Sequence, residues 1–121
     1  MNAVAVSIGA ALGALTRWQA GLMFNTRWAG FPLGTLLVNL VGGFLIGIAL
    51  EWLGRQPNEL LKLLLVTGFL GGLTTFSSFS GESLALLRHG NFGLALAHPL
   101  AHVLGALVAA WLGMKLVQSL I

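Results

Sequence analysis

The chain has 121 residues, of which 57% are hydrophobic and only 7% are charged, whereas an average soluble domain has about 25% charged residues. A chain this short has too little interior to hide so many apolar side chains, so the composition excludes an ordinary soluble domain and indicates a membrane protein. The six Lys and Arg residues behind the net charge of +3 form no patch, which argues against nucleic-acid binding, and the absence of cysteine excludes disulfides and cysteine-based metal sites.

Apolar segments long enough for transmembrane helices follow one another along the chain, since a span needs roughly 20 mostly apolar residues. They cover about residues 2–24, 33–53, 60–87 and 92–120. Pro57 blocks a continuous helix between the second and third segments, and Asn58 can cap the next one. The first segment follows no basic stretch, so we expect a membrane span and not a cleaved signal peptide. The sequence predicts one all-α domain of four transmembrane helices in the cell inner membrane.

Small residues recur at four-residue spacing in every expected span. The rows are Gly9 and Gly13, Gly43 and Gly47, Gly68 and Gly72, and Gly105, Ala109 and Gly113. Such rows let helix backbones approach closely in a bilayer, where no hydrophobic effect drives helices together. We expect them to mark helix–helix contacts and assign them no chemistry.

The positive charges do not determine the orientation of the chain in the membrane. With four spans, one side would carry Arg55, Lys62 and Lys115, and the other Arg17, Arg27 and Arg88. An excess of Lys and Arg normally fixes the cytoplasmic side, so this balance predicts insertion in both orientations. Two opposite copies can then form an antiparallel homodimer, which resembles the inverted repeats of larger transporters. A fixed orientation with an accidental balance is the alternative.

Glycines and hydroxyl residues interrupt the third span over residues 67–80. Adjacent Gly71 and Gly72 make a continuous helix unfavourable, because each glycine costs about 1 kcal/mol relative to alanine. Carbonyl groups freed within the bilayer need a partner. In an antiparallel dimer the two breaks would meet near the symmetry axis, so that backbone carbonyls of Gly71 and Thr74 from both chains can surround a cation. Sodium suits such neutral oxygens, although the spacing does not identify it.

Phe76 and Phe79 follow the break three residues apart, and Ser77 and Ser80 share a second helical face. The edge of an aromatic ring is positive and attracts an anion. A phenylalanine pair beside hydroxyl groups is therefore compatible with a small anion. The alternative is a packing pair, because apolar stripes are usually packing surfaces.

Several isolated polar residues lie within the expected spans. Asn39 offers two donors and one acceptor, so it either replaces water around an anion or joins two helices. Glu82 is a functional candidate as an ionisable residue near the end of a span, or a vestibule charge. His98 and His102 lie one turn apart, but no further metal ligand is evident, which favours pore-lining or helix-bridging imidazoles. Arg17 is either an ion-pair partner or a source of positive potential that attracts anions.

Two long motifs resemble the Fluc family of fluoride channels, also called CrcB proteins. They are Gly34-Thr35-Leu36-Leu37-Val38-Asn39-Leu40-Val41-Gly42-Gly43 and Thr67-Gly68-Phe69-Leu70-Gly71-Gly72-Leu73-Thr74-Thr75-Phe76-Ser77-Ser78-Phe79-Ser80. The likeness also includes Gly13-Ala14-Leu15-Thr16-Arg17-Trp18 in the first span. The resemblance implies an antiparallel dual-topology homodimer with two fluoride pores and a central sodium ion that is not transported. Gly71 and Thr74 match the positions whose backbone carbonyls hold this sodium.

The resemblance also implies a fluoride pathway. Phe76 and Phe79 match phenylalanines whose edges face fluoride, and Asn39 matches the pore asparagine. Glu82 matches a vestibule acid, and Arg17 a basic residue near the pore entrance. A polar track of hydroxyl groups falls on Ser77, Ser78 and Ser80. The fourth span departs from the family, with His98, His102 and Ala106 where some relatives carry Tyr or Ser; of these, His102 is kept in the predicted pathway.

The sequence thus predicts passive export of fluoride that relieves its toxicity, with a second copy and the lipid bilayer as partners. A small multidrug exporter of similar size is one alternative, but that class needs an acidic residue deep in the first span, where the only charge is Arg17. A non-transporting assembly subunit is another, but it does not explain the polar break beside paired phenylalanines. An enzyme is not expected, because no nucleophile–base set can be assembled.

Overall fold

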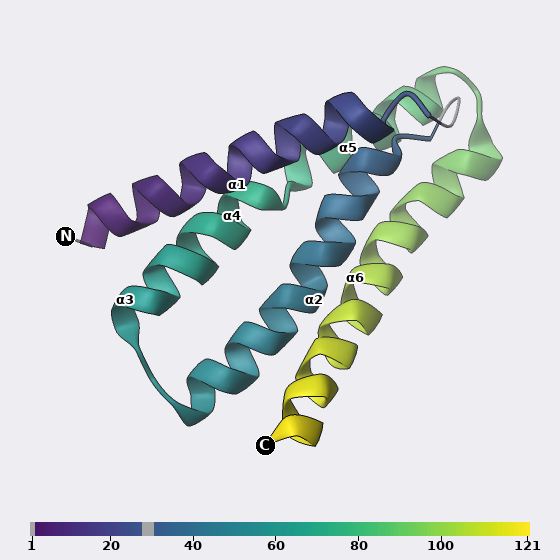
Figure 1. The fold of residues 1–121 in the computed structure, drawn as a ribbon. Helices are drawn as coiled ribbons and strands as arrows, with labels where there is room; N and C mark the ends of the chain where they lie inside the picture. The colour runs from purple at the N-terminus through teal and green to yellow at the C-terminus, as the bar shows by residue number, and fades with distance from the viewer. Residues whose placement is uncertain (1, 28–30) are drawn as a thin grey trace.

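The fold was obtained as a computed structural model, which describes residues 2–27 and 31–121. Within these ranges the chain is helical apart from short connections and contains no strand. The long uninterrupted helices are α1 (Asn2–Phe24), α2 (Leu33–Arg55) and α6 (Phe92–Leu120) (Figure 1). The all-helical class expected from composition is confirmed.

The third helical stretch consists of four pieces. These are α3 (Glu59–Lys62), the wider π-helical turns of η1 (Leu63–Leu70), α4 (Gly71–Leu73) and α5 (Phe76–Arg88). Asn58 caps α3, since its Oδ1 accepts a hydrogen bond of 3.0 Å from the Leu61 amide. Between α4 and α5 the backbone of Thr74 and Thr75 is extended, with ψ angles of 157° and 124°.

The extended residues are not the glycines that the sequence singled out as helix breakers. Gly71 and Gly72 form the first two positions of α4, with Gly71 at φ −62° and ψ −36°. Gly72 serves close packing instead, because a methyl group there would lie 3.0 Å from Ala10 Cα of α1. The extended backbone at Thr74 and Thr75 lies within the segment 67–80 where the sequence predicted the interruption, two or three residues after the glycine pair.

The rows of small residues do lie at contacts between helices. A methyl group at Gly13 of α1 would lie 2.7 Å from the Leu73 amide nitrogen, and one at Gly43 of α2 would lie 2.8 Å from the Ala106 carbonyl oxygen. Backbones this close leave no room for a side chain. Gly105 differs, since the nearest group to it is the flexible end of the Leu40 side chain.

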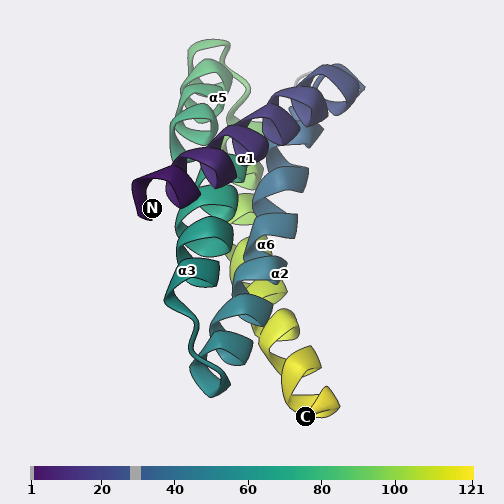
Figure 2. The same ribbon diagram turned by 60° about the vertical axis from the view of Figure 1, so that its left-hand side comes forward.

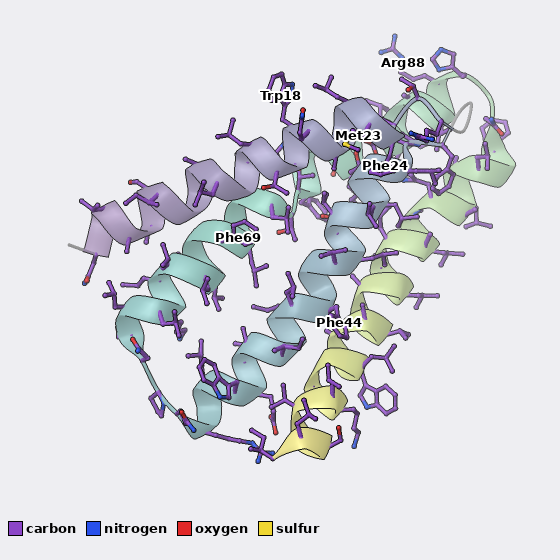
Figure 3. The ribbon with its side chains drawn as sticks, viewed as in Figure 1. Trp18, Met23, Phe24, Phe44, Phe69 and Arg88 are labelled. Atoms are coloured by element: carbon purple, nitrogen blue, oxygen red, sulfur yellow. The ribbon has the colours of Figure 1, made fainter. Side chains whose placement is uncertain are left out.

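The helices form two packed pairs. Figures 1 and 2 show α2 and α6 side by side, while α1 crosses η1 and α4; α5 packs on α6. The buried cluster between α2 and the third stretch consists of Val38, Leu70 and Leu73, with Phe69 projecting from η1 toward α2 (Figure 3). Trp18, by contrast, points away from the fold and is 62% exposed. Many other large apolar side chains are exposed as well, so the outer surface of the helices must be covered by lipid or by a second protein.

Three helical stretches of the described chain are long and apolar enough to cross a membrane. They are Leu33–Arg55, Glu59–Arg88 and Phe92–Leu120. Helix α1 has 23 residues, as α2 does, but is not among them, and it carries Arg17 and Gln19 along its length. The expected first span, about residues 2–24, therefore stays a prediction.

Candidate functional site

A groove of about 520 Å³ lies beside the extended residues Thr74 and Thr75, between α2, the third stretch and α6. Six of the residues predicted to have a functional role line it: Asn39, Gly71, Thr74, Phe76, Phe79 and His102. The other predicted residues do not line it, namely Arg17, Ser77, Ser78, Ser80 and Glu82. The fold thus brings together side chains from three helical stretches that the sequence could only place separately.

The Asn39 side chain holds the extended segment to α2. Its Oδ1 accepts a hydrogen bond of 2.9 Å from the Thr75 amide, and its Nδ2 donates one of 3.2 Å to the Thr75 carbonyl. Its Nδ2 also lies 3.0 Å from Nδ1 of His102 on α6. Both N–H groups of the amide, and one of the two lone pairs of its oxygen, are therefore engaged within the chain.

The same pair of bonds changes the surroundings of the Gly71 carbonyl. In a continuous α-helix the Thr75 amide would donate to Gly71, four residues earlier, but here it donates to Asn39. The neighbouring carbonyls have donors, since Leu70 accepts from Thr74 and Gly72 accepts from Arg17 Nε at 3.1 Å. A neutral carbonyl released from the α-helical pattern beside a groove suits a hard cation such as sodium.

Arg17 therefore has a structural contact that the sequence did not indicate. Its guanidinium supports the end of α4 by binding the Gly72 carbonyl, which agrees with the preference of cations for helix C-termini. An ion pair of Arg17, one of its two predicted roles, is not among those found in the described chain.

Phe76 and Phe79 form an edge-to-face pair with ring centroids 5.4 Å apart and an interplanar angle of 62°. Thr75 starts their helix, because its Oγ1 accepts a hydrogen bond of 3.1 Å from the Ser78 amide. The Phe79 ring also lies 4.8 Å from that of His102 and stacks on that of His98. Phe76 is 78% exposed in the single chain, so one wall of the groove is open.

Glu82 joins α2, α5 and α6 next to the groove. Its Oε2 accepts a hydrogen bond of 2.5 Å from Thr35 Oγ1, and its Oε1 lies 3.1 Å from Nε2 of the fully buried His98. The other His98 nitrogen, Nδ1, lies 2.8 Å from Ser83 Oγ. Sequence reasoning missed Thr35 and Ser83, because nothing in their local spacing indicates partners 47 and 15 residues away.

The fold also places one acidic residue, Glu82, beside the two histidines. Potential ligand atoms of Glu82, His98 and His102 lie within 4.8 Å of one another. The sequence indicated the helical spacing of the histidines but no third ligand, because Glu82 lies on a different helix.

Comparison with known proteins identifies the family. The family described as CrcB-like protein, Camphor Resistance (CrcB), matches residues 4–114. The chain belongs to the CrcB family. The resemblance noted in the sequence is thereby confirmed.

Individual CrcB relatives are similar over nearly their whole length. A protein of Aromatoleum aromaticum named fluoride-specific ion channel FluC is 51% identical over 112 residues, covering 91% of this chain and 86% of the relative. A protein of the same name from Tolumonas auensis is 48% identical over 121 residues, covering 98% and 95%. CrcB relatives are named as ion channels, which are not enzymes. With its apolar helices, this CrcB protein is a multi-pass membrane protein, of the inner membrane in bacteria.

Proposed function

We propose that this protein is a fluoride channel in which the groove beside Thr74 and Thr75 forms part of the ion route. The observation that carries the proposal is the meeting of the Phe76–Phe79 pair, Asn39 and His102 in one groove at the helix break. The printed names of the relatives support fluoride as the ion.

The chemistry of this groove suits an ion that is small and strongly hydrated. A selective pore must replace the water around fluoride and still let the ion leave. Ring edges are weakly positive, and neutral donors bind an anion less tightly than arginine would. Arg17 does not line the groove and is bound to the Gly72 carbonyl. The route would therefore attract fluoride without trapping it.

The remaining predicted residues would extend the route beyond the groove. Ser77 and Ser80 are exposed on α5 and Ser78 is half-buried, so these hydroxyl groups form the proposed polar track. Glu82 would stand at the vestibule, in contact with Thr35 and His98. Arg17 would contribute positive potential near the entrance.

The proposed channel is an antiparallel homodimer of four-span subunits whose third helix is broken within the membrane. The balance of positive charges supports insertion in both orientations. The open groove and the exposed Phe76 ring leave an apolar surface that a second copy would cover. Carbonyl oxygens of Gly71 and Thr74 from both copies would hold a structural sodium ion, which would neutralise their partial charge and would not be transported.

Fluoride export through this channel would be passive. Fluoride enters cells as neutral HF from an acidic medium and dissociates inside. A negative membrane potential then drives the anion outward by about 2.3 kcal/mol per charge per 100 mV. No pump or bound nucleotide is needed.

An efflux assay on purified protein in liposomes tests the channel. Fluoride should leave quickly after the membrane potential is released with an ionophore, and chloride should stay inside. Chloride efflux as fast as that of fluoride, or no efflux of either ion, would contradict the proposal.

A further inference from the structure

We propose that Asn39 is a positioning residue that fixes the tautomer of His102, so that the Nε2–H of His102 is the donor left free for an anion. This inference rests on the proposed anion route through the groove. It assigns the anion contact to His102, because both N–H donors of Asn39 are engaged by the protein.

The Asn39 amide has a defined orientation. Two bonds to Thr75 fix it, one accepted by Oδ1 at 2.9 Å and one donated by Nδ2 at 3.2 Å. Turning the amide by 180° would set its nitrogen against the Thr75 amide and its oxygen against the Thr75 carbonyl. The hydrogen-bond network therefore assigns the nitrogen and oxygen of this amide.

The Asn39 amide determines which nitrogen of His102 carries the proton. The donor-only Nδ2 of Asn39 lies 3.0 Å from His102 Nδ1. An amide nitrogen cannot accept a hydrogen bond, so Nδ1 of His102 must accept. A neutral imidazole with an accepting Nδ1 carries its proton on Nε2. The hydrogen bonds between Thr75 and Asn39 thus determine the tautomer of His102.

Nε2 of His102 lies in a buried environment. His102 is 4% exposed, and its Nε2 is buried without a hydrogen-bond partner in the described chain. A buried donor without an acceptor is destabilising. His102 lines the groove, and the Phe79 and His98 rings lie 4.8 and 4.5 Å from its own. A small anion is an acceptor of the size and charge that this donor needs.

A metal ion is a poorer occupant, although Glu82, His98 and His102 lie close together. A histidine nitrogen binds a metal through its lone pair, and in this tautomer Nε2 of His102 carries a proton. Nε2 of His98 is also engaged, at 3.1 Å from Glu82 Oε1. Asn39→Asp should reverse the preference, because a carboxylate oxygen beside Nδ1 would accept its proton and leave a lone pair on Nε2.

Nitrogen-15 NMR of the full-length protein in lipid nanodiscs tests the tautomer at neutral pH. The expected result is an Nε2-protonated His102 in the wild type and an Nδ1-protonated His102 in Asn39→Asp. Sodium fluoride, but not sodium chloride, should shift the Nε2 resonance of the wild type. An Nδ1-protonated or doubly protonated wild-type ring would overturn the inference. So would the same tautomer in both proteins, or a resonance that ignores fluoride.

Two substitutions at His102 test its donor in the liposome assay. Glutamine can offer an amide N–H near the position of Nε2, whereas leucine cannot. His102→Gln should conduct fluoride about tenfold faster than His102→Leu, as expected for one hydrogen bond to a charged group. Equal flux in two variants that elute as the wild type does in gel filtration would overturn the role of the donor. Wild-type protein that conducts no fluoride contradicts the proposed function instead, whatever tautomer NMR reports.

Discussion

Asn39 and Thr75 form a reciprocal pair of hydrogen bonds, in which one side-chain amide satisfies both backbone groups of the other residue. Thr75 lies between α4 and α5, where its amide and carbonyl lack the partners that a continuous helix provides. A polar side chain on α2 thus supports the irregular backbone of the third stretch. This pair explains why an extended segment can persist within an apolar protein.

Removing the Asn39 side chain should destabilise the fold. Asn39→Ala would leave the Thr75 amide and carbonyl without partners, and we expect a loss of about 1–3 kcal/mol in the free energy of unfolding. Titration with a denaturing detergent measures the change. Asn91→Ala is a matched control, because Asn91 is exposed and its side chain makes no capping bond. A similar stability for both variants would contradict the role of Asn39.

Substitution of the paired phenylalanines should slow fluoride while leaving the assembly intact. Phe76→Ile or Phe79→Ile removes a ring edge from the groove but keeps an apolar side chain. If a ring edge stabilises fluoride about as strongly as it stabilises another aromatic ring, losing it should reduce the fluoride flux by about two- to tenfold. Phe92→Ile is the control, because Phe92 is 69% exposed at the start of α6 and does not line the groove. Flux at the wild-type rate in both test variants would remove the rings from the route.

Some features of the fold could be predicted from the sequence because they depend on local chemistry. Asn58 caps a helix as its position after Pro57 indicates. The rows of small residues could be assigned to helix contacts for the same reason, since their spacing is helical. Such signals involve residues within about four positions of one another.

The site could be predicted only in part, because its organisation depends on partners far apart in the sequence. Asn39 and Thr75 are separated by 36 positions and Asn39 and His102 by 63. The sequence predicted an interruption within residues 67–80, but the extended positions are Thr74 and Thr75, where Asn39 of another helix binds the Thr75 backbone. A single sequence contains no signal for such pairings.

The close contact between α2 and α6 predicts a sharp difference between two glycines of one helix. Gly47→Ala would place a methyl group 3.0 Å from Ala110 Cα and closer still to its carbonyl group, so the helices must separate. We expect a destabilisation of about 1–3 kcal/mol. Gly54→Ala meets no atom within 4 Å and should stabilise the protein by up to about 1 kcal/mol, because alanine is the better helix former. Thermal unfolding of both variants measures the difference; equal shifts would show that this contact tolerates a side chain.

Insertion in both orientations can be tested cleanly, because the chain contains no cysteine. Gln56→Cys lies in the connection between α2 and α3, and His89→Cys lies in the connection between α5 and α6, at the opposite end of the helices (Figure 1). Both positions are exposed. If both orientations occur, a thiol reagent that cannot cross the membrane should label about half of each variant in intact cells. Full labelling of one variant with none of the other would mean a single orientation and would rule out the antiparallel dimer. Permeabilised cells provide the reference for complete labelling.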